Sequence, residues 1–158
     1  MTLSPPARLA RILALAVPAL LLGGAYLSQY GFGLYPCEMC WWQRWPHFAA
    51  GGLALLAYVS PPARFWTALA ALAIVTSGAI GLFHAGVEYG WWPGITSCAL
   101  VAGNGSGNAL EDIMNTPLVR CDQPAWTLFG ISLAGYNFLV STAAGLAIGR
   151  LLMKDRRA

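Results

Sequence analysis

Four long apolar stretches, nearly free of charged residues, divide the chain. A bilayer core of about 30 Å is crossed by a helix of about 20 mainly apolar residues. Inside lipid each stretch satisfies its backbone hydrogen bonds within itself, which favours helices. The pattern therefore predicts one membrane domain, residues 1–158, in the form of an all-α four-helix transmembrane bundle. The expected spans are about residues 12–30, 42–59, 65–87 and 126–152.

The first stretch has a second interpretation, because Arg8 and Arg11 precede it as they would precede a cleaved signal peptide. Its apolar run is longer than the usual signal-peptide core, and no A-x-A cleavage site follows. We therefore interpret it as a retained span.

Composition supports a membrane protein. The chain is 58% hydrophobic and 9% charged, whereas soluble domains carry about 25% charged residues. So few charges cannot cover the surface of a water-soluble domain. The net charge of +3 forms no basic patch, since most of the positive charge lies near the two chain ends. A soluble globular domain, a disordered tail and a nucleic-acid binder are thus excluded.

The distribution of Lys and Arg predicts the topology. With four spans, both termini and the 60–64 loop share one side. Seven of the nine basic residues lie on that side: Arg8, Arg11, Arg64, Arg150, Lys154, Arg156 and Arg157. The positive-inside rule makes that side cytoplasmic, so loops 31–41 and 88–125 lie on the opposite, non-cytoplasmic side. An aromatic belt is expected at the non-cytoplasmic membrane boundary, formed by Tyr35, Trp41, Trp42, Trp45, Tyr89, Trp91, Trp92 and Trp126.

All four cysteines fall in the two non-cytoplasmic loops: Cys37 and Cys40 in the first, Cys98 and Cys121 in the second. An even count in an oxidising compartment predicts two disulfides. Three pairings are possible in principle. Pairing the cysteines within each loop needs the fewest assumptions about the fold, and the residues alone do not choose.

The C-x-x-C spacing of Cys37 and Cys40 favours redox chemistry. A structural disulfide suits Cys98 and Cys121, which have 22 intervening residues. A Cys37–Cys40 disulfide would close a much shorter ring, which adds little loop-closure stability. A c-type haem site would need His where Trp41 stands, and a structural zinc site would need a second close pair. Both of these readings are weaker.

Three further residues, Arg44, His84 and Glu88, are candidates for the same site. Pro36 predicts a helix start, which places Cys40 where the helix dipole stabilises a thiolate. Arg44 follows at i+4 on the same face, either for function or as a side chain that snorkels to the headgroups. His84 and Glu88 form another i, i+4 pair, either at the site or as a satisfied interfacial pair.

Three runs have the pattern of a known family. They are residues 36–44 (PCEMCWWQR), residues 84–98 (HAGVE, then WWPG and Cys98) and residues 121–137 (CDQPAW, then LFGISLAGYN). Together with the four spans they make nearly the whole chain resemble the disulfide bond formation protein B (DsbB) family. The resemblance implies a multi-pass enzyme of the bacterial inner membrane. It would reoxidise a periplasmic thioredoxin-like oxidase (DsbA type) and pass the electrons to the membrane quinone pool.

The resemblance also implies residue roles. The reduced partner attacks a Cys98–Cys121 disulfide, with Cys98 forming the mixed disulfide. Cys121 then exchanges with Cys37 of a Cys37–Cys40 disulfide, which frees the Cys40 thiolate to face the quinone. Arg44 binds and polarises the quinone, and His84 lines its site. The expected acceptor is ubiquinone or menaquinone, and no metal or nucleic acid is expected.

Two further expectations concern the second periplasmic loop and the helix packing. Residues 103–108 (GNGSGN) suit a flexible segment, and Leu110, Ile113 and Met114 fit a short amphipathic surface helix. Gly145 and Gly149 form a G-x-x-x-G that predicts close packing inside the bundle.

Two rival functions stay open. One is a structural tetraspan protein with permanent disulfides. The other is a related thiol oxidoreductase with a dedicated partner.

Overall fold

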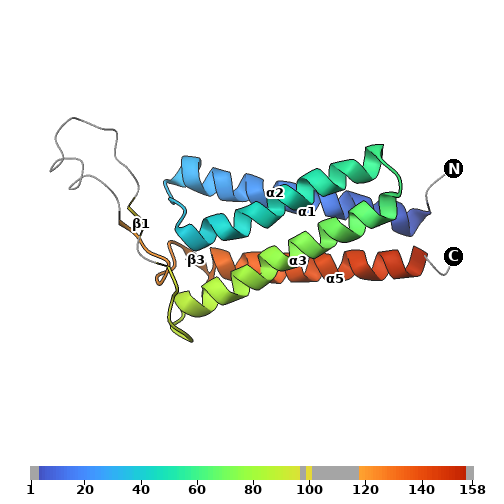
Figure 1. Cartoon of the computed structure of the whole chain (residues 1–158). Helices are drawn as coiled ribbons and strands as arrows, with labels where there is room; N and C mark the ends of the chain where they lie inside the picture. The colour runs from blue at the N-terminus through green and yellow to red at the C-terminus, as the bar shows by residue number, and fades with distance from the viewer. Residues whose placement is uncertain (1–3, 97–98, 101–117, 156–158) are drawn as a thin grey trace.

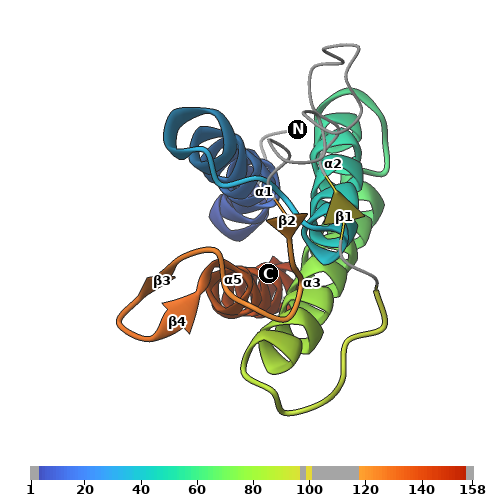
Figure 2. The same cartoon turned by 90° about the vertical axis from the view of Figure 1, so that its left-hand side faces the viewer.

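The computed structural model of the chain describes residues 4–96, 99–100 and 118–155. The described part contains four helices: α1 (Pro5–Phe32), α2 (Glu38–Val59), α3 (Ala63–Glu88) and α5 (Leu133–Asp155). They lie side by side along one direction (Figure 1). Seen from the end, they surround a common centre, with α2 beside α3 and α5 next to both α3 and α1 (Figure 2). The predicted helix bundle is confirmed.

Three of the described helices, α1, α3 and α5, are long and apolar enough to cross a membrane. Helix α2 has 22 residues but is not among them. The first half of α2 carries Gln43, Arg44 and His47, which lower its mean hydropathy, and all three are buried in the bundle. Three of the four predicted spans thus coincide with helices that are long and apolar enough to cross a membrane. The polar composition of α2 reflects residues that are buried in the bundle.

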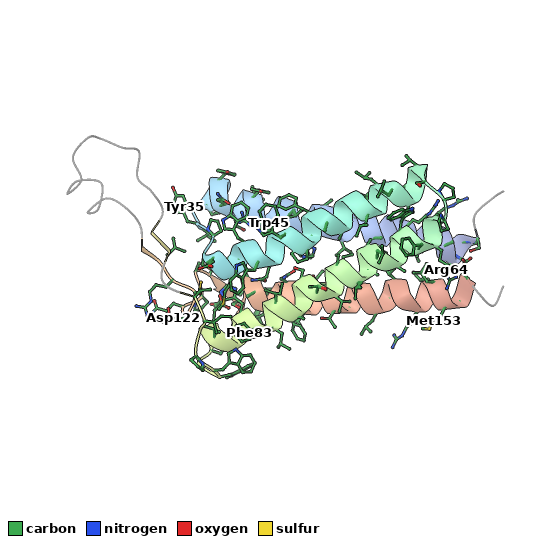
Figure 3. The ribbon with its side chains drawn as sticks, viewed as in Figure 1. Tyr35, Trp45, Arg64, Phe83, Asp122 and Met153 are labelled. Atoms are coloured by element: carbon green, nitrogen blue, oxygen red, sulfur yellow. The ribbon has the colours of Figure 1, made fainter. Side chains whose placement is uncertain are left out.

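Both termini and the α2–α3 connection lie at one end of the bundle (Figure 1). Arg64 and Met153 mark this end in Figure 3, and Tyr35, Phe83 and Asp122 mark the other. Asp155 joins helices here, because it accepts a hydrogen bond from Ser4 and lies 3.6 Å from an Arg64 guanidinium nitrogen. The two termini therefore share an end, as the predicted topology requires.

The helix expected from Trp126 begins later, at Leu133. Residues 127–132 instead form an antiparallel hairpin of β3 (Thr127–Leu128) and β4 (Ile131–Ser132). Its two-residue turn has positive φ at Phe129 (49°) and Gly130 (77°), as a type I′ turn requires. The Tyr89 hydroxyl donates to the Gly130 carbonyl oxygen and accepts from the Ser132 N–H, both at 2.9 Å. The hairpin is thereby held against the end of α3.

A second short ladder connects the two arms of the long loop. Strand β1 (Ala99–Leu100) pairs antiparallel with β2 (Leu118–Val119), and Ala99 stands opposite Val119. The residue after Cys98 is therefore joined to a residue just before Cys121. Cys98 itself, the segment 103–108 and the expected surface helix around Leu110, Ile113 and Met114 lie outside the described residues.

Small residues allow the helices to approach closely. A core cluster of the bundle is built largely from alanines, among them Ala10, Ala50 and Ala70. A side chain at Gly145 would collide with Val75, whereas one at Gly149 would meet nothing within 4 Å. Of the predicted G-x-x-x-G, only Gly145 is thus a close-packing position.

Candidate redox site

The C-x-x-C motif forms the first turn of α2, as predicted. Cys37 is the N-cap, and its Sγ accepts a hydrogen bond from the Cys40 N–H at 3.3 Å. The two sulfurs lie 2.8 Å apart, within hydrogen-bonding distance of one another. Cys40 therefore lies where the free N–H groups and dipole of the helix favour a negative charge.

Cys121 joins this pair from a distant part of the chain. It follows β2, and its Sγ lies within 4.8 Å of both the Cys37 Sγ and a ring nitrogen of His84. All three side chains are buried, with Cys37 only 2% exposed. The fold therefore brings together one cysteine from each of the two loops that carry cysteines.

The two thiols of the motif differ in acidity. The hydrogen bond to Cys40 and burial raise the pKa of the Cys37 thiol above the usual range of cysteine. In the reduced pair, Cys40 consequently loses its proton first. The thiolate is the nucleophilic form of cysteine, so the pair is asymmetric, with a reactive Cys40 and a protonated Cys37.

His84 faces the Cys37 sulfur with a defined ring nitrogen. The Gln43 amide nitrogen donates to the Met39 carbonyl oxygen, and it lies 2.8 Å from His84 Nδ1. Nδ1 is therefore the acceptor, and the ring proton of neutral His84 is on Nε2. Nε2 lies 3.6 Å from the Cys37 Sγ and 3.7 Å from a Glu88 oxygen. The expected His84–Glu88 pair is thus formed.

Arg44 is directed into the bundle instead of snorkelling to the headgroups. It is 6% exposed, and its guanidinium donates to Gln29 Oε1 at 2.7 Å and to the Ala25 carbonyl oxygen at 3.3 Å. It also lies 4.9 Å from the centre of the Tyr26 ring and 5.0 Å from that of Trp41. These contacts join α2 to α1 and hold the charge one turn below Cys40.

A cavity of about 270 Å³ opens beside these residues, between α1, α2, α3 and α5. Cys40, Arg44 and His84 line it together with apolar side chains that include Leu20, Leu21 and Leu133. Most of its wall is thus apolar, with a sulfur and a cation at one place. This combination suits a flat apolar ligand that carries polar oxygens.

Among the other polar residues that line the same cavity, Gln43, His47 and Asn137 were not predicted from the sequence. A signal was present, because polar residues within an apolar span are candidates for function. Gln43 and His47 are also spaced i, i+4, on the same helix face.

Cys37, His84 and Cys121 offer three donor atoms of the kinds that zinc accepts. The residues present could therefore contribute ligands to a thiophilic metal when the cysteines are reduced. The same geometry serves exchange between sulfurs, which needs no metal.

Comparisons with known proteins agree on one family. A profile of the family described as "Disulfide bond formation protein DsbB" matches residues 7–150. The chain is 33% identical over 168 residues to Disulfide bond formation protein B of Verminephrobacter eiseniae, with 96% of this chain and 89% of that protein covered. It is 32% identical over 139 residues to Disulfide bond formation protein B 2 of Pseudomonas syringae pv. syringae, with 82% and 78% covered. No solved structure matches the chain.

Each alignment covers well over two thirds of the relative's length, and the family match spans most of this sequence. Three of its described helices are also long and apolar enough to cross a membrane. The chain is therefore a multi-pass membrane protein with a role in disulfide bond formation, and it belongs to the DsbB family.

Proposed function

We propose that the chain is a protein-thiol:quinone oxidoreductase of the bacterial inner membrane. It reoxidises a periplasmic DsbA-type oxidase and passes the electrons to a membrane quinone. The observation that carries the proposal is the row of three sulfurs. Cys121 lies within 4.8 Å of Cys37, and Cys37 lies 2.8 Å from Cys40 beside the cavity.

The four helices all cross the membrane, with the termini in the cytoplasm. Three have the required length and hydropathy, and both chain ends lie at the end of the bundle marked by Arg64 (Figures 1 and 3). Helix α2 is enclosed by neighbours on the side of its polar residues. The excess of Lys and Arg near the termini supports this orientation.

Electrons pass along the sulfurs by thiol–disulfide exchange. A partner thiolate attacks Cys98 Sγ and breaks a Cys98–Cys121 bond, with both electrons of that bond going to Cys121. The Cys121 thiolate attacks Cys37 Sγ and breaks the Cys37–Cys40 bond, which leaves the Cys40 thiolate. The second thiolate of the partner displaces Cys98 from the mixed disulfide and releases the partner disulfide. The freed Cys98 thiolate attacks Cys121 Sγ, which restores the Cys98–Cys121 bond and leaves Cys37 and Cys40 as the reduced pair. The β1–β2 ladder supports the first pairing, because it joins the chain next to Cys98 to the chain next to Cys121.

The cavity fits a quinone ring. Its walls are mainly apolar, Arg44 supplies a cation, and His47 Nδ1 is a buried polar atom without a partner among the described residues. When bound, ubiquinone or menaquinone accepts the two electrons and two protons that the partner dithiol gives up. Arg44 holds the Cys40 end of the cavity positive, and the N–H of His84 faces the Cys37 sulfur. The net reaction converts partner dithiol and quinone into partner disulfide and quinol.

The test uses the full chain, purified in detergent with both disulfides formed. Ubiquinone-1 absorbance is followed after a reduced DsbA-type oxidase is added. We expect reduction that requires the partner and is lost in Cys40→Ser, whereas Thr67→Val, a buried change outside the cavity, keeps it. Intact disulfides with no reduction of any common quinone would overturn the proposal in favour of a structural tetraspan protein. Efficient oxidation of the dithiol with another acceptor would favour a related thiol oxidoreductase.

A further inference from the structure

A row of polar side chains continues from the redox site into the bundle. Gln43 and His47 come from α2, Ser77 from α3, and Asn137 and Ser141 from α5. Asn137 contacts all four of the others within hydrogen-bonding distance. Polar groups are costly inside a membrane span unless they are paired or functional, so each atom of this row needs a partner.

The amide of Asn137 has one defined orientation. Its nitrogen donates to the Ser77 carbonyl oxygen at 3.1 Å and to Gln43 Oε1 at 2.8 Å. A backbone carbonyl can only accept, so the amide oxygen must face the other way. There it accepts from the Ser141 hydroxyl at 2.9 Å and lies 2.9 Å from His47 Nε2.

This orientation determines the tautomer of His47. Asn137 Oδ1 has no proton to give, so His47 Nε2 must donate, and Nδ1 of the neutral ring carries a lone pair. Nδ1 is buried and has no hydrogen-bond partner among the described residues. His47, only 3% exposed, lines the cavity. A buried acceptor without a partner is a binding position for a ligand that donates.

His47 lies at the inner end of the cavity. Cys40, Arg44 and His47 are spaced i, i+4 and i+7, on one face of α2, and all three line the cavity. A rise of 1.5 Å per residue separates Cys40 from His47 by about 10 Å along the helix axis. A ligand that reaches beyond Arg44 therefore comes to the side chain of His47.

Given the quinone-linked function proposed above, we propose that His47 binds a hydroxyl of the product quinol through Nδ1, and that Asn137 holds the tautomer which leaves Nδ1 free to accept. A quinone offers only carbonyl acceptors, so neutral His47 favours the quinol over the quinone. Because binding and reduction are linked, tighter binding of the quinol makes the bound quinone a stronger oxidant. Each tenfold preference corresponds to about 30 mV for a two-electron couple.

The test measures binding without turnover. In a Cys40→Ser background, ubiquinone-1 and its quinol are titrated anaerobically, and quenching of tryptophan fluorescence gives each Kd. We expect His47→Leu to raise the quinol Kd about tenfold, the loss of one buried hydrogen bond, with a much smaller change for the quinone. Thr67→Val in the same background should change neither. Equal changes for both ligands, or no change, would overturn the role of His47.

A second measurement tests the tautomer directly. The chain has two histidines, so the only histidine signals of a ¹⁵N-histidine-labelled His84→Gln variant come from His47. We expect a protonated Nε2 and an unprotonated Nδ1, and loss of this preference in Asn137→Leu. The opposite tautomer would overturn the proposal. If the Cys40→Ser parent binds neither ligand, the proposed function itself fails. If it binds both and His47→Leu binds them equally well, only the role of His47 fails.

Discussion

His84 Nε2 lies 3.6 Å from the Cys37 Sγ, although the two residues are 47 positions apart in the chain. Gln43 fixes the ring from the other side through Nδ1. The sulfur that receives Cys121 in the proposed exchange therefore has an N–H group directed at it. Such a donor stabilises negative charge on sulfur, and sulfur carries that charge when a disulfide is attacked or released.

Removing this donor should slow exchange. We expect His84→Ala to lower the rate at which the oxidised protein accepts electrons from a reduced partner by about tenfold or more, as for a hydrogen bond to a charged group. Stopped-flow measurement of one turnover without quinone isolates this step. Because His84 also lines the cavity, the apparent quinone KM should rise. Thr67→Val, a buried change outside the cavity, is the control. A His84→Ala variant with unchanged exchange rate and quinone KM would contradict both roles.

The raised pKa of Cys37 predicts the pattern of alkylation in the reduced protein. A raised pKa keeps Cys37 protonated at a pH where an ordinary cysteine ionises, so iodoacetamide should label Cys40 first. Labelling of Cys37 should increase only at higher pH. Mass spectrometry of peptides after short pulses across a pH series measures both rates.

The Cys40→Ser variant separates acidity from access in that experiment. The exchange of thiolate for hydroxyl removes the charge that opposes ionisation of Cys37, so its labelling should begin at lower pH than in the parent. Burial alone would leave the pH profile of Cys37 unmoved. An identical profile in parent and variant would therefore count against the thiol pair as the cause.

Replacing Arg44 by Lys should raise the KM for quinone. The Arg44 guanidinium donates hydrogen bonds to Gln29 and Ala25, and it lies over two aromatic rings. A lysine ammonium offers only a point charge. We expect Arg44→Lys to raise the quinone KM about tenfold, which corresponds to about 1.4 kcal/mol, while the KM for the partner stays the same. Arg150→Lys, an exposed basic residue on α5, is the matched control. An unchanged quinone KM would argue that the charge alone suffices.

Local patterns predicted the parts of the structure that local forces determine. The helix bundle and the start of α2 at the C-x-x-C motif follow from apolar runs and from Pro36. The late start of α5 was missed because the apolar run continues through residues 127–132, where a turn with positive φ at Phe129 and a long-range contact to Tyr89 select a hairpin.

The contacts that make the site could not be read in the same way. The approach of Cys121 to Cys37, and of Asn137 to His47, depends on how α5 and the β2 arm pack against α2. No periodicity encodes such pairs. A polar residue in a span signals that a partner exists, and the fold decides which residue it is.

The packing of α3 against α5 connects stability to the site and gives the last prediction. A Cβ at Gly81 would lie 2.9 Å from the Ala134 carbonyl oxygen and 3.1 Å from the amide nitrogen of Asn137. Because a backbone carbonyl cannot move aside as a side chain can, Gly81→Ala should lower the free energy of unfolding by about 1–3 kcal/mol. Gly149→Ala is the matched control, since a Cβ there meets nothing within 4 Å, and alanine in a helix is favoured by about 0.5–1 kcal/mol.

Thermal unfolding in detergent, followed by circular dichroism, compares the two variants. We expect a lower Tm for Gly81→Ala and an equal or higher Tm for Gly149→Ala. Because the added methyl displaces Asn137 as well, Gly81→Ala should also weaken quinol binding, which Gly149→Ala leaves unchanged. Equal Tm values for the two variants would mean that α3 and α5 do not meet at Gly81, and the orientation inferred for Asn137 would then lose its basis.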